Sequence, residues 1–181
     1  TCIIALENCD LEQTVEFSAR AASAPKVHLG AAAGKKFRMK DLISAMMLES
    51  FNDCAVAIAE QIGGSVEAFS SLMNDYARQI GCTDSYFLTP NGLDAEDGNG
   101  YHHTTANDLA LIMRYCIRQS PKADLFLGIT AEAEHSFSDL DGTMTYHCYN
   151  HNAFLNMMDG ALSGKTGFTG KAGYCYVGAL K

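Results

Sequence analysis

The sequence has no excess of basic residues. Thirteen lysines and arginines stand against 21 aspartates and glutamates, which gives a net charge of −8 and a pI of about 5.1. Proteins that bind nucleic acid normally present a basic patch to the phosphates, so this balance argues against a nucleic-acid partner. Beyond solubility, the acidic charge says little about function.

The chain also lacks an apolar run long enough to span a membrane, a charged-then-apolar leader, an internal repeat and a low-complexity linker. The missing leader carries little weight, because Thr1 is expected to be a cut end with further residues upstream. With 181 residues, of which 48% are hydrophobic and 19% charged, the chain suits one domain, or most of one, with a substantial core.

Closely spaced cysteine pairs are absent as well. A disulfide scaffold would be shorter and denser in cysteine, and the spacing fits no zinc site. We therefore expect most of the cysteines to be small buried hydrophobes, with no metal and no other cofactor. The histidines are expected to be surface or hydrogen-bonded residues. The seven cysteines are Cys2, Cys9, Cys54, Cys82, Cys116, Cys148 and Cys175.

Helical periodicity dominates the first two-thirds of the chain. Residues 1–8 are typical of the later turns of a helix, and further helices are predicted over 39–50, 52–64, 65–81 and 105–120. Gly63-Gly64, Gly81 and Ser120-Pro121 supply the stops. Residues 21–37 and 89–105 are predicted to be irregular, because glycine and turn-forming residues are frequent there.

Strand patterns are concentrated in the last third. Two strands are predicted over 129–139 and 143–150, around an Asp141-Gly142 turn, and two more over 164–169 and 174–180; a short strand is expected at 13–18. This order predicts an α+β fold with a helical lobe beside an antiparallel sheet. The last strand stops at Lys181, so the C-terminus is also expected to be cut.

The first chemistry-bearing stretch is Ser50-Phe51-Asn52, in the short break between two predicted helices. A hydroxyl and a carboxamide two residues apart in a tight turn can face one cleft, where the hydroxyl relays a proton and the amide holds a peptide group. The alternative is that Ser50, Asn52 and Asp53 are helix caps.

The second stretch is Lys165-Thr166-Gly167, on a predicted strand. A lysine facing a cleft offers a positive charge to a carboxylate, and Gly167 allows a ligand to approach the backbone closely. The alternative is an exposed strand lysine that runs into a glycine turn.

The two stretches together resemble a known signature. S-x-x-K, S-D-N and K-T-G mark the penicillin-binding proteins and class A β-lactamases. Longer stretches are similar to the low-molecular-mass D-alanyl-D-alanine carboxypeptidases, the S11 serine peptidases: LISAMMLESFNDCAVAIAEQIGGSVEAFSSLMN, TPNGLD, HHTTANDLALIMRY and GKTGFTGKAGYC. The resemblance covers Thr1–Lys181 and implies a transpeptidase-like fold, with residues 1–181 as a partial catalytic domain truncated at both ends.

The resemblance also implies roles for single residues. Ser50 and Lys165 would form a proton network that serves the leaving amine, and Asn52 would hold the peptide group of the substrate. Lys165 and Thr166 would bind the terminal carboxylate. The backbone N–H of Phe168 would supply half of an oxyanion hole.

One motif of the family is missing. Its nucleophilic serine and a lysine three residues later are expected just before Thr1. Ser23-Ala24-Pro25-Lys26 is the one S-x-x-K in the chain, and Pro25 places it in a loop rather than on the helical turn that the motif needs. The chain alone is therefore expected to be inactive and not to bind penicillin covalently. Phe51 replaces the small residue common in S-x-N, which leaves the substrate preference open.

The family reaction removes the terminal D-Ala from peptidoglycan stem peptides through an acyl-enzyme. The implied partners are a stem peptide ending in D-Ala-D-Ala and β-lactams, and the implied location is the cell envelope outside the cytoplasm, with a possible membrane anchor outside this chain. A β-lactamase or endopeptidase of the same superfamily is one alternative. A non-catalytic binding module derived from such an enzyme is another.

Overall fold

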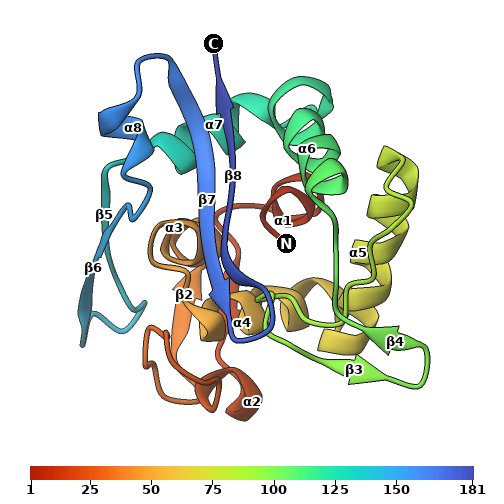
Figure 1. The fold of residues 1–181 in the computed structure, drawn as a ribbon. Coiled ribbons are helices and arrows are strands. Elements are labelled where there is room, and N and C mark those ends of the chain that lie inside the picture. Colours follow the sequence, from red (N-terminus) through yellow and green to blue (C-terminus); the bar gives the residue numbers. More distant parts are fainter.

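The computed structural model describes all of residues 1–181. Helices make up one side of the molecule, and a long β-hairpin formed by β7 and β8 crosses in front of them (Figure 1). The helix α1 lies near the centre, behind this hairpin, and α5 and α6 lie to one side (Figure 1). The predicted α+β class is confirmed.

The five predicted helices lie close to their predicted boundaries, and three further helices, α2, α7 and α8, were not predicted. The structure has α1 (Cys2–Asn8), α2 (Ala19–Ala22), α3 (Met39–Glu49), α4 (Asn52–Gly63), α5 (Val66–Ile80), α6 (Ala106–Arg114), α7 (Ala123–Ala131) and α8 (Phe154–Met157). The helix α5 ends as its glycine predicts, because Gly81 has a φ of 95°, a left-handed conformation that favours glycine. After α6 the chain continues as a π-helical turn, η1 (Tyr115–Gln119), and the helical run ends at Ser120.

The strands form four antiparallel pairs. Each pair is a separate two-stranded sheet: β1 (Thr14–Glu16) with β2 (Lys36–Arg38), β3 (Glu96–Asp97) with β4 (Gly100–Tyr101), β5 (Glu134–Ser138) with β6 (Thr145–Tyr149), and β7 (Ala161–Thr169) with β8 (Gly173–Leu180). The strand β2 and the β3–β4 hairpin lie in stretches that were predicted to be irregular.

One predicted strand begins too early. Residues 129–131 belong to the end of α7, a helix that the sequence pattern did not reveal. The hydroxyl of Thr130 donates a hydrogen bond to the Phe126 carbonyl, 2.9 Å away and one turn earlier in the helix, and both side chains are buried. Burial of this helix between α3 and β7 therefore outweighs the strand preference of the β-branched residues.

The core lies where α3 and α4 meet the N-terminal helix and the β1–β2 pair. Phe17, Phe37 and Phe69 are the largest fully buried side chains, and α3 and α4 contribute eight buried residues each. Five of the seven cysteines are also buried, which confirms the expectation for most of them. Val177 and Ala179 of β8 pack against this cluster, and the hairpin β7–β8 contacts the helices α6, α7 and α8.

Two glycines allow the Tyr176 side chain to pack closely on one face of the hairpin. Gly164 and Gly178 lie opposite each other in the register, and the Tyr176 hydroxyl covers both. A Cβ at position 164 would collide with that hydroxyl and lie 2.7 Å from Asn152 Nδ2. Phe154 of α8 packs against the Tyr176 ring in a tilted arrangement, with ring centroids 4.7 Å apart. These contacts fix the strand that carries Lys165.

No helix of the chain combines the length and the apolar character needed to cross a bilayer.

Candidate active site

A sharp turn joins α3 to α4 and exposes a serine hydroxyl. Ser50 follows the last residue of α3 with φ 62° and ψ 34°, and it is the only residue other than glycine with a positive φ. This left-handed conformation costs an L-residue about 1–2 kcal/mol. Phe51 then adopts an extended conformation, and Asn52 is the first residue of α4.

The hairpin strand β7 brings a lysine to this serine. Lys165 Nζ donates a hydrogen bond to Ser50 Oγ, and it lies 2.8 Å from the carbonyl oxygen of Thr166. Residues that are 115 positions apart in the sequence thus meet through their side chains. The two motifs that the sequence predicts to share one cleft are therefore adjacent.

The electrostatics of Lys165 are unusual, because its side chain is partly buried although none of the ion pairs of the chain includes it. Burial lowers the pKa of the Lys165 ammonium to about 8. A lysine with such a pKa exchanges protons readily near neutral pH, and its charge remains available for a ligand anion. Both properties suit a group that relays a proton or binds a carboxylate.

Asn52 also lies at this turn, but it is mostly buried. Its Nδ2 donates to the carbonyl of Pro25 at 3.1 Å, and its backbone N–H donates to the carbonyl of Val27 at 2.8 Å. Its Oδ1 makes no hydrogen bond within the chain, so this oxygen and the second amide hydrogen remain for a ligand. The alternative that Ser50, Asn52 and Asp53 are helix caps is wrong for the start of α4, because Phe51 occupies the N-cap position and no side chain caps it. Ser50 does occupy the C-cap position of α3.

The sequence reading missed the segment that contacts Asn52. Residues 25–30 follow α2 and lie against the start of α4, where the Asp53 carboxylate accepts hydrogen bonds from the backbone of Leu29 and Gly30, each at 2.9 Å. The sequence predicts Asp53 only as a helix cap. Its local position in the first turn of α4 fits a cap, and nothing nearby in the sequence signals the long-range contact.

The strand β7 pairs with β8 on one side and with no strand on the other. Thr166, Gly167 and Phe168 follow Lys165 along it, and no atom lies within 4 Å of the position that a Cβ on Gly167 would take. Phe168 is 62% exposed. The strand therefore presents Thr166–Phe168 beside an open space next to Lys165.

The turn of this hairpin is held by a loop from another part of the chain. Thr169 Oγ1 donates to Asp94 Oδ1 at 2.9 Å, and the N–H of Ala172 donates to Thr169 Oγ1 at 3.0 Å. The stretch TPNGLD thereby contacts the end of the strand that carries Lys165.

The internal S-x-x-K does not form a helical serine–lysine pair. Ser23 is the residue that ends α2, and its hydroxyl donates to the carbonyl of Arg20 at 2.9 Å. Pro25 and Lys26 lie beyond the helix, and Ser23 and Lys26 are both exposed. The interpretation of this stretch as a loop is confirmed.

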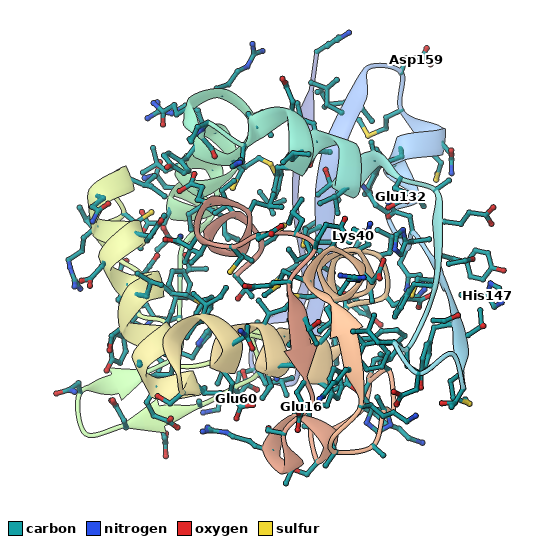
Figure 2. The ribbon with its side chains drawn as sticks, turned by 180° about the vertical axis from the view of Figure 1, so that it is seen from behind. Glu16, Lys40, Glu60, Glu132, His147 and Asp159 are labelled. Carbon is teal, nitrogen blue, oxygen red and sulfur yellow. The ribbon has the colours of Figure 1, made fainter.

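The histidines take structural positions. His102 Nδ1 accepts a hydrogen bond from the N–H of Leu88 at 2.9 Å, and His147 pairs with Ser136 across β5 and β6. His147 lies at the edge of the molecule (Figure 2). No group of three or more histidine, cysteine, aspartate and glutamate side chains is placed to hold a metal ion.

Comparisons with known proteins agree with this geometry. A family model described as D-alanyl-D-alanine carboxypeptidase, peptidase S11, matches residues 3–181. The chain is 32% identical over 177 residues to the D-alanyl-D-alanine carboxypeptidase DacB2 of Mycobacterium tuberculosis, covering 98% of this chain and 58% of that protein. It is 36% identical over 144 residues to DacA of Escherichia coli, covering 78% of this chain and 32% of that protein.

The fold agrees as well. A crystal structure of a D-alanyl-D-alanine carboxypeptidase from M. tuberculosis H37Rv superposes with a TM-score of 0.86 at 29% identity, covering 99% of this chain and 64% of that one. The chain thus spans about a third to three-fifths of the length of these curated relatives. By the family model and by these relatives, the chain belongs to the D-alanyl-D-alanine carboxypeptidase family of S11 peptidases.

Proposed function

We propose that residues 1–181 are part of the catalytic domain of a serine-type D-alanyl-D-alanine carboxypeptidase of the bacterial cell envelope. The substrate would be a peptidoglycan stem peptide that ends in D-Ala-D-Ala, and β-lactams would bind in the same cleft. The observation that carries this proposal is the contact between Lys165 Nζ and Ser50 Oγ at the unpaired edge of β7.

The terminal carboxylate of the peptide would bind at Lys165 and Thr166. Lys165 has no carboxylate partner of its own, so a substrate carboxylate supplies the missing counter-charge. The backbone N–H of Phe168 would donate to the oxygen of the scissile carbonyl, and Gly167 leaves room for the peptide beside the strand. Asn52 would contact the preceding peptide group through its free Oδ1.

The nucleophile would come from residues outside the 181, since the chain contains no S-x-x-K on a helix. Its serine oxygen would bond to the carbonyl carbon, and the C–N bond to the last D-Ala would break. Ser50 and Lys165 would relay a proton to the leaving amine. Water would then attack the ester, release the shortened peptide and return the proton to the serine.

A D-Ala release assay tests this function. The protein translated from the whole gene, with the residues on either side of this chain, should release D-Ala from acetyl-Lys(acetyl)-D-Ala-D-Ala and become labelled by a fluorescent penicillin. The 181-residue chain alone should do neither. Covalent labelling of the chain alone would contradict the proposed origin of the nucleophile, and a Ser23→Ala variant would show whether that serine is the labelled one.

The same assay separates the alternatives. A β-lactamase would hydrolyse a β-lactam faster than the D-Ala-D-Ala peptide, and an endopeptidase would prefer a cross-linked peptide. A non-catalytic module would bind the peptide but release no D-Ala. Release of D-Ala with slow turnover of the β-lactam is the result that the proposal predicts.

A further inference from the structure

The segment Pro25–Gly30 is attached to the turn that carries the S-x-N motif. Asn52 alone binds two of its carbonyl groups, those of Pro25 and Val27, through its side chain and its backbone N–H. Lys26 lies between these two carbonyls. Its backbone is therefore held next to the same residue that is proposed to contact the substrate.

The attachment is completed by a buried carboxylate. Asp53 is 1% exposed and accepts three backbone N–H groups, from Leu29, Gly30 and Cys54, each at 2.9 Å. No cation pairs with it. Hydrogen bonds to an ionised acceptor are about twice as strong as neutral ones, so Asp53 is a strong fixing point for the segment.

The fixed segment presents side chains to solvent. Lys26 and Val27 are exposed, and Lys26 takes part in none of the ion pairs of the chain. Three of the eight lysines, Lys35, Lys36 and Lys40, do pair with carboxylates, as Lys40 does with Glu12 at 2.6 Å. An unpaired cation whose backbone is held next to Asn52, in a chain with net charge −8, is suited to an anionic ligand.

We propose that Pro25–Gly30 forms a further wall of the substrate cleft, in which Lys26 binds a carboxylate of the peptide upstream of the terminal D-Ala-D-Ala. Asp53 is the positioning residue of this wall. The inference rests on the proposed function for the direction of the peptide. If the terminal carboxylate lies at Lys165 and the preceding peptide group at Asn52, the residues before it pass the segment that Asn52 holds.

Two peptides that differ in one charge test the inference. The probes are acetyl-Glu-Ala-D-Ala-D-Ala and acetyl-Gln-Ala-D-Ala-D-Ala, and their dissociation constants are measured by NMR titration of the 181-residue chain. An exposed ion pair contributes about two- to fivefold in affinity, so the Glu peptide should bind more tightly by about that factor. Binding needs no nucleophile, and the test is therefore independent of turnover.

Three lysine variants assign the preference. Lys26→Glu should abolish or reverse it, and Lys26→Arg should keep it. Lys122→Glu, the same charge change just before α7, should leave it unchanged. Equal affinities of the wild type for the two peptides, or an unchanged preference in Lys26→Glu, would overturn the inference.

Asp53→Asn tests the positioning role. The amides of Leu29 and Gly30 should exchange faster with deuterium, and the Glu-over-Gln preference should shrink, while a Lys165→Met control loses affinity for both peptides. A preference that survives in a folded Asp53→Asn protein would exclude Asp53 from this role. If the Asp53→Asn variant does not fold, the Lys26→Glu and Lys26→Arg variants still test whether Pro25–Gly30 binds a carboxylate of the peptide.

The outcomes also separate this inference from the proposed function. The Glu peptide could bind more tightly in a way that depends on Lys26, while the whole-gene protein releases no D-Ala. That result would support the binding role of Pro25–Gly30 and contradict the carboxypeptidase function. Release of D-Ala together with equal affinities for the Glu and Gln peptides would support the carboxypeptidase function and contradict the binding role of Pro25–Gly30. If neither peptide binds, both are rejected.

Discussion

Two partly buried lysines of this chain have opposite surroundings. Lys35 contacts Asp139 at 2.7 Å, Thr143 at 2.7 Å and Asp141 at 3.4 Å, and it connects the β1–β2 region to the turn of the β5–β6 hairpin. Lys165, on the strand β7, donates hydrogen bonds only to a hydroxyl and a backbone carbonyl. One lysine has its counter-charge inside the fold, and the other has none.

The pKa values of the two lysines shift in opposite directions. The hydrogen bond to Asp139 raises the pKa of Lys35, and the same contact holds the pKa of Asp139 well below its usual range. Burial lowers the pKa of Lys165 to about 8. A pair such as Lys35–Asp139 contributes to folding, whereas an unpaired buried ammonium opposes it. The unfavourable free energy of burying the Lys165 ammonium is explained if this charge binds an anionic ligand.

The largest effect is expected on activity. Lys165→Met should lower kcat/KM for D-Ala release by the whole-gene protein by about 10²–10⁴-fold, the range typical for a positioned proton-transfer group. Lys35→Met should lower kcat/KM only in proportion to the share of the protein that this substitution leaves unfolded. Steady-state kinetics at a temperature where both variants are folded make the comparison. An equal loss in both variants would remove the distinction between the two lysines.

The next effect is expected on the melting temperature. Asp139→Ala removes the acceptor for Lys35 and for the backbone N–H groups of Thr143 and Met144, and we expect a fall of about 5–10 °C at pH 7. The folded-state pKa of Asp139 is lowered, so its contribution is present above the unfolded pKa, about 3.9, and is lost as the pH falls further. The gap between wild type and variant should therefore narrow below about pH 4.

A gap that stays constant from pH 7 to pH 3 would show that the carboxylate charge of Asp139 does not stabilise this turn. Asp139→Asn keeps the shape of the side chain and is the matched variant.

A smaller effect of opposite sign is expected from Lys165→Met on stability. Below pH 8 the folded protein holds a desolvated ammonium, and its removal should raise the free energy of unfolding by about 1–2 kcal/mol. Between pH 8 and about 10.5 the folded lysine is neutral while the unfolded one is still charged. Wild-type stability should therefore rise with pH in that window, and the advantage of the variant should decline.

Urea unfolding at pH 7 and pH 10 measures this difference. A Lys165→Met protein that is less stable than the wild type at pH 7 would mean that the contact with Ser50 stabilises the fold by more than the burial of the charge costs.

Local sequence signals, such as helix caps and terminating glycines, predicted the parts of the fold that depend on residues close in the sequence. Ser65 accepts from the Ala68 N–H at 3.1 Å and Gly81 ends the same helix, as their positions indicate. Ser50 and Lys165 were found because each belongs to a short motif, although only the fold brings them together.

The parts that were missed depend on distant contacts. Thr130 bonds to Ser163 at 2.7 Å, a contact that buries α7 against β7, and Asp53 bonds to backbone groups 23 and 24 residues earlier. The partners of Thr130 and Asp53 are distant in the sequence. The local pattern therefore predicted a strand at Thr130 and a helix cap at Asp53. Tertiary contacts of this kind cannot be inferred from spacing alone.

The titration of the two lysines tests the central claim most directly. The pKa values of Lys165 and Lys35 are measured by NMR of the side-chain Cε signals, with and without acetyl-Ala-D-Ala-D-Ala. The account predicts a pKa of about 8 for free Lys165 and an increase when the peptide carboxylate binds beside it, with no change at Lys35. A Lys165 that titrates near the ordinary value of about 10.4 and does not respond to the peptide would contradict it.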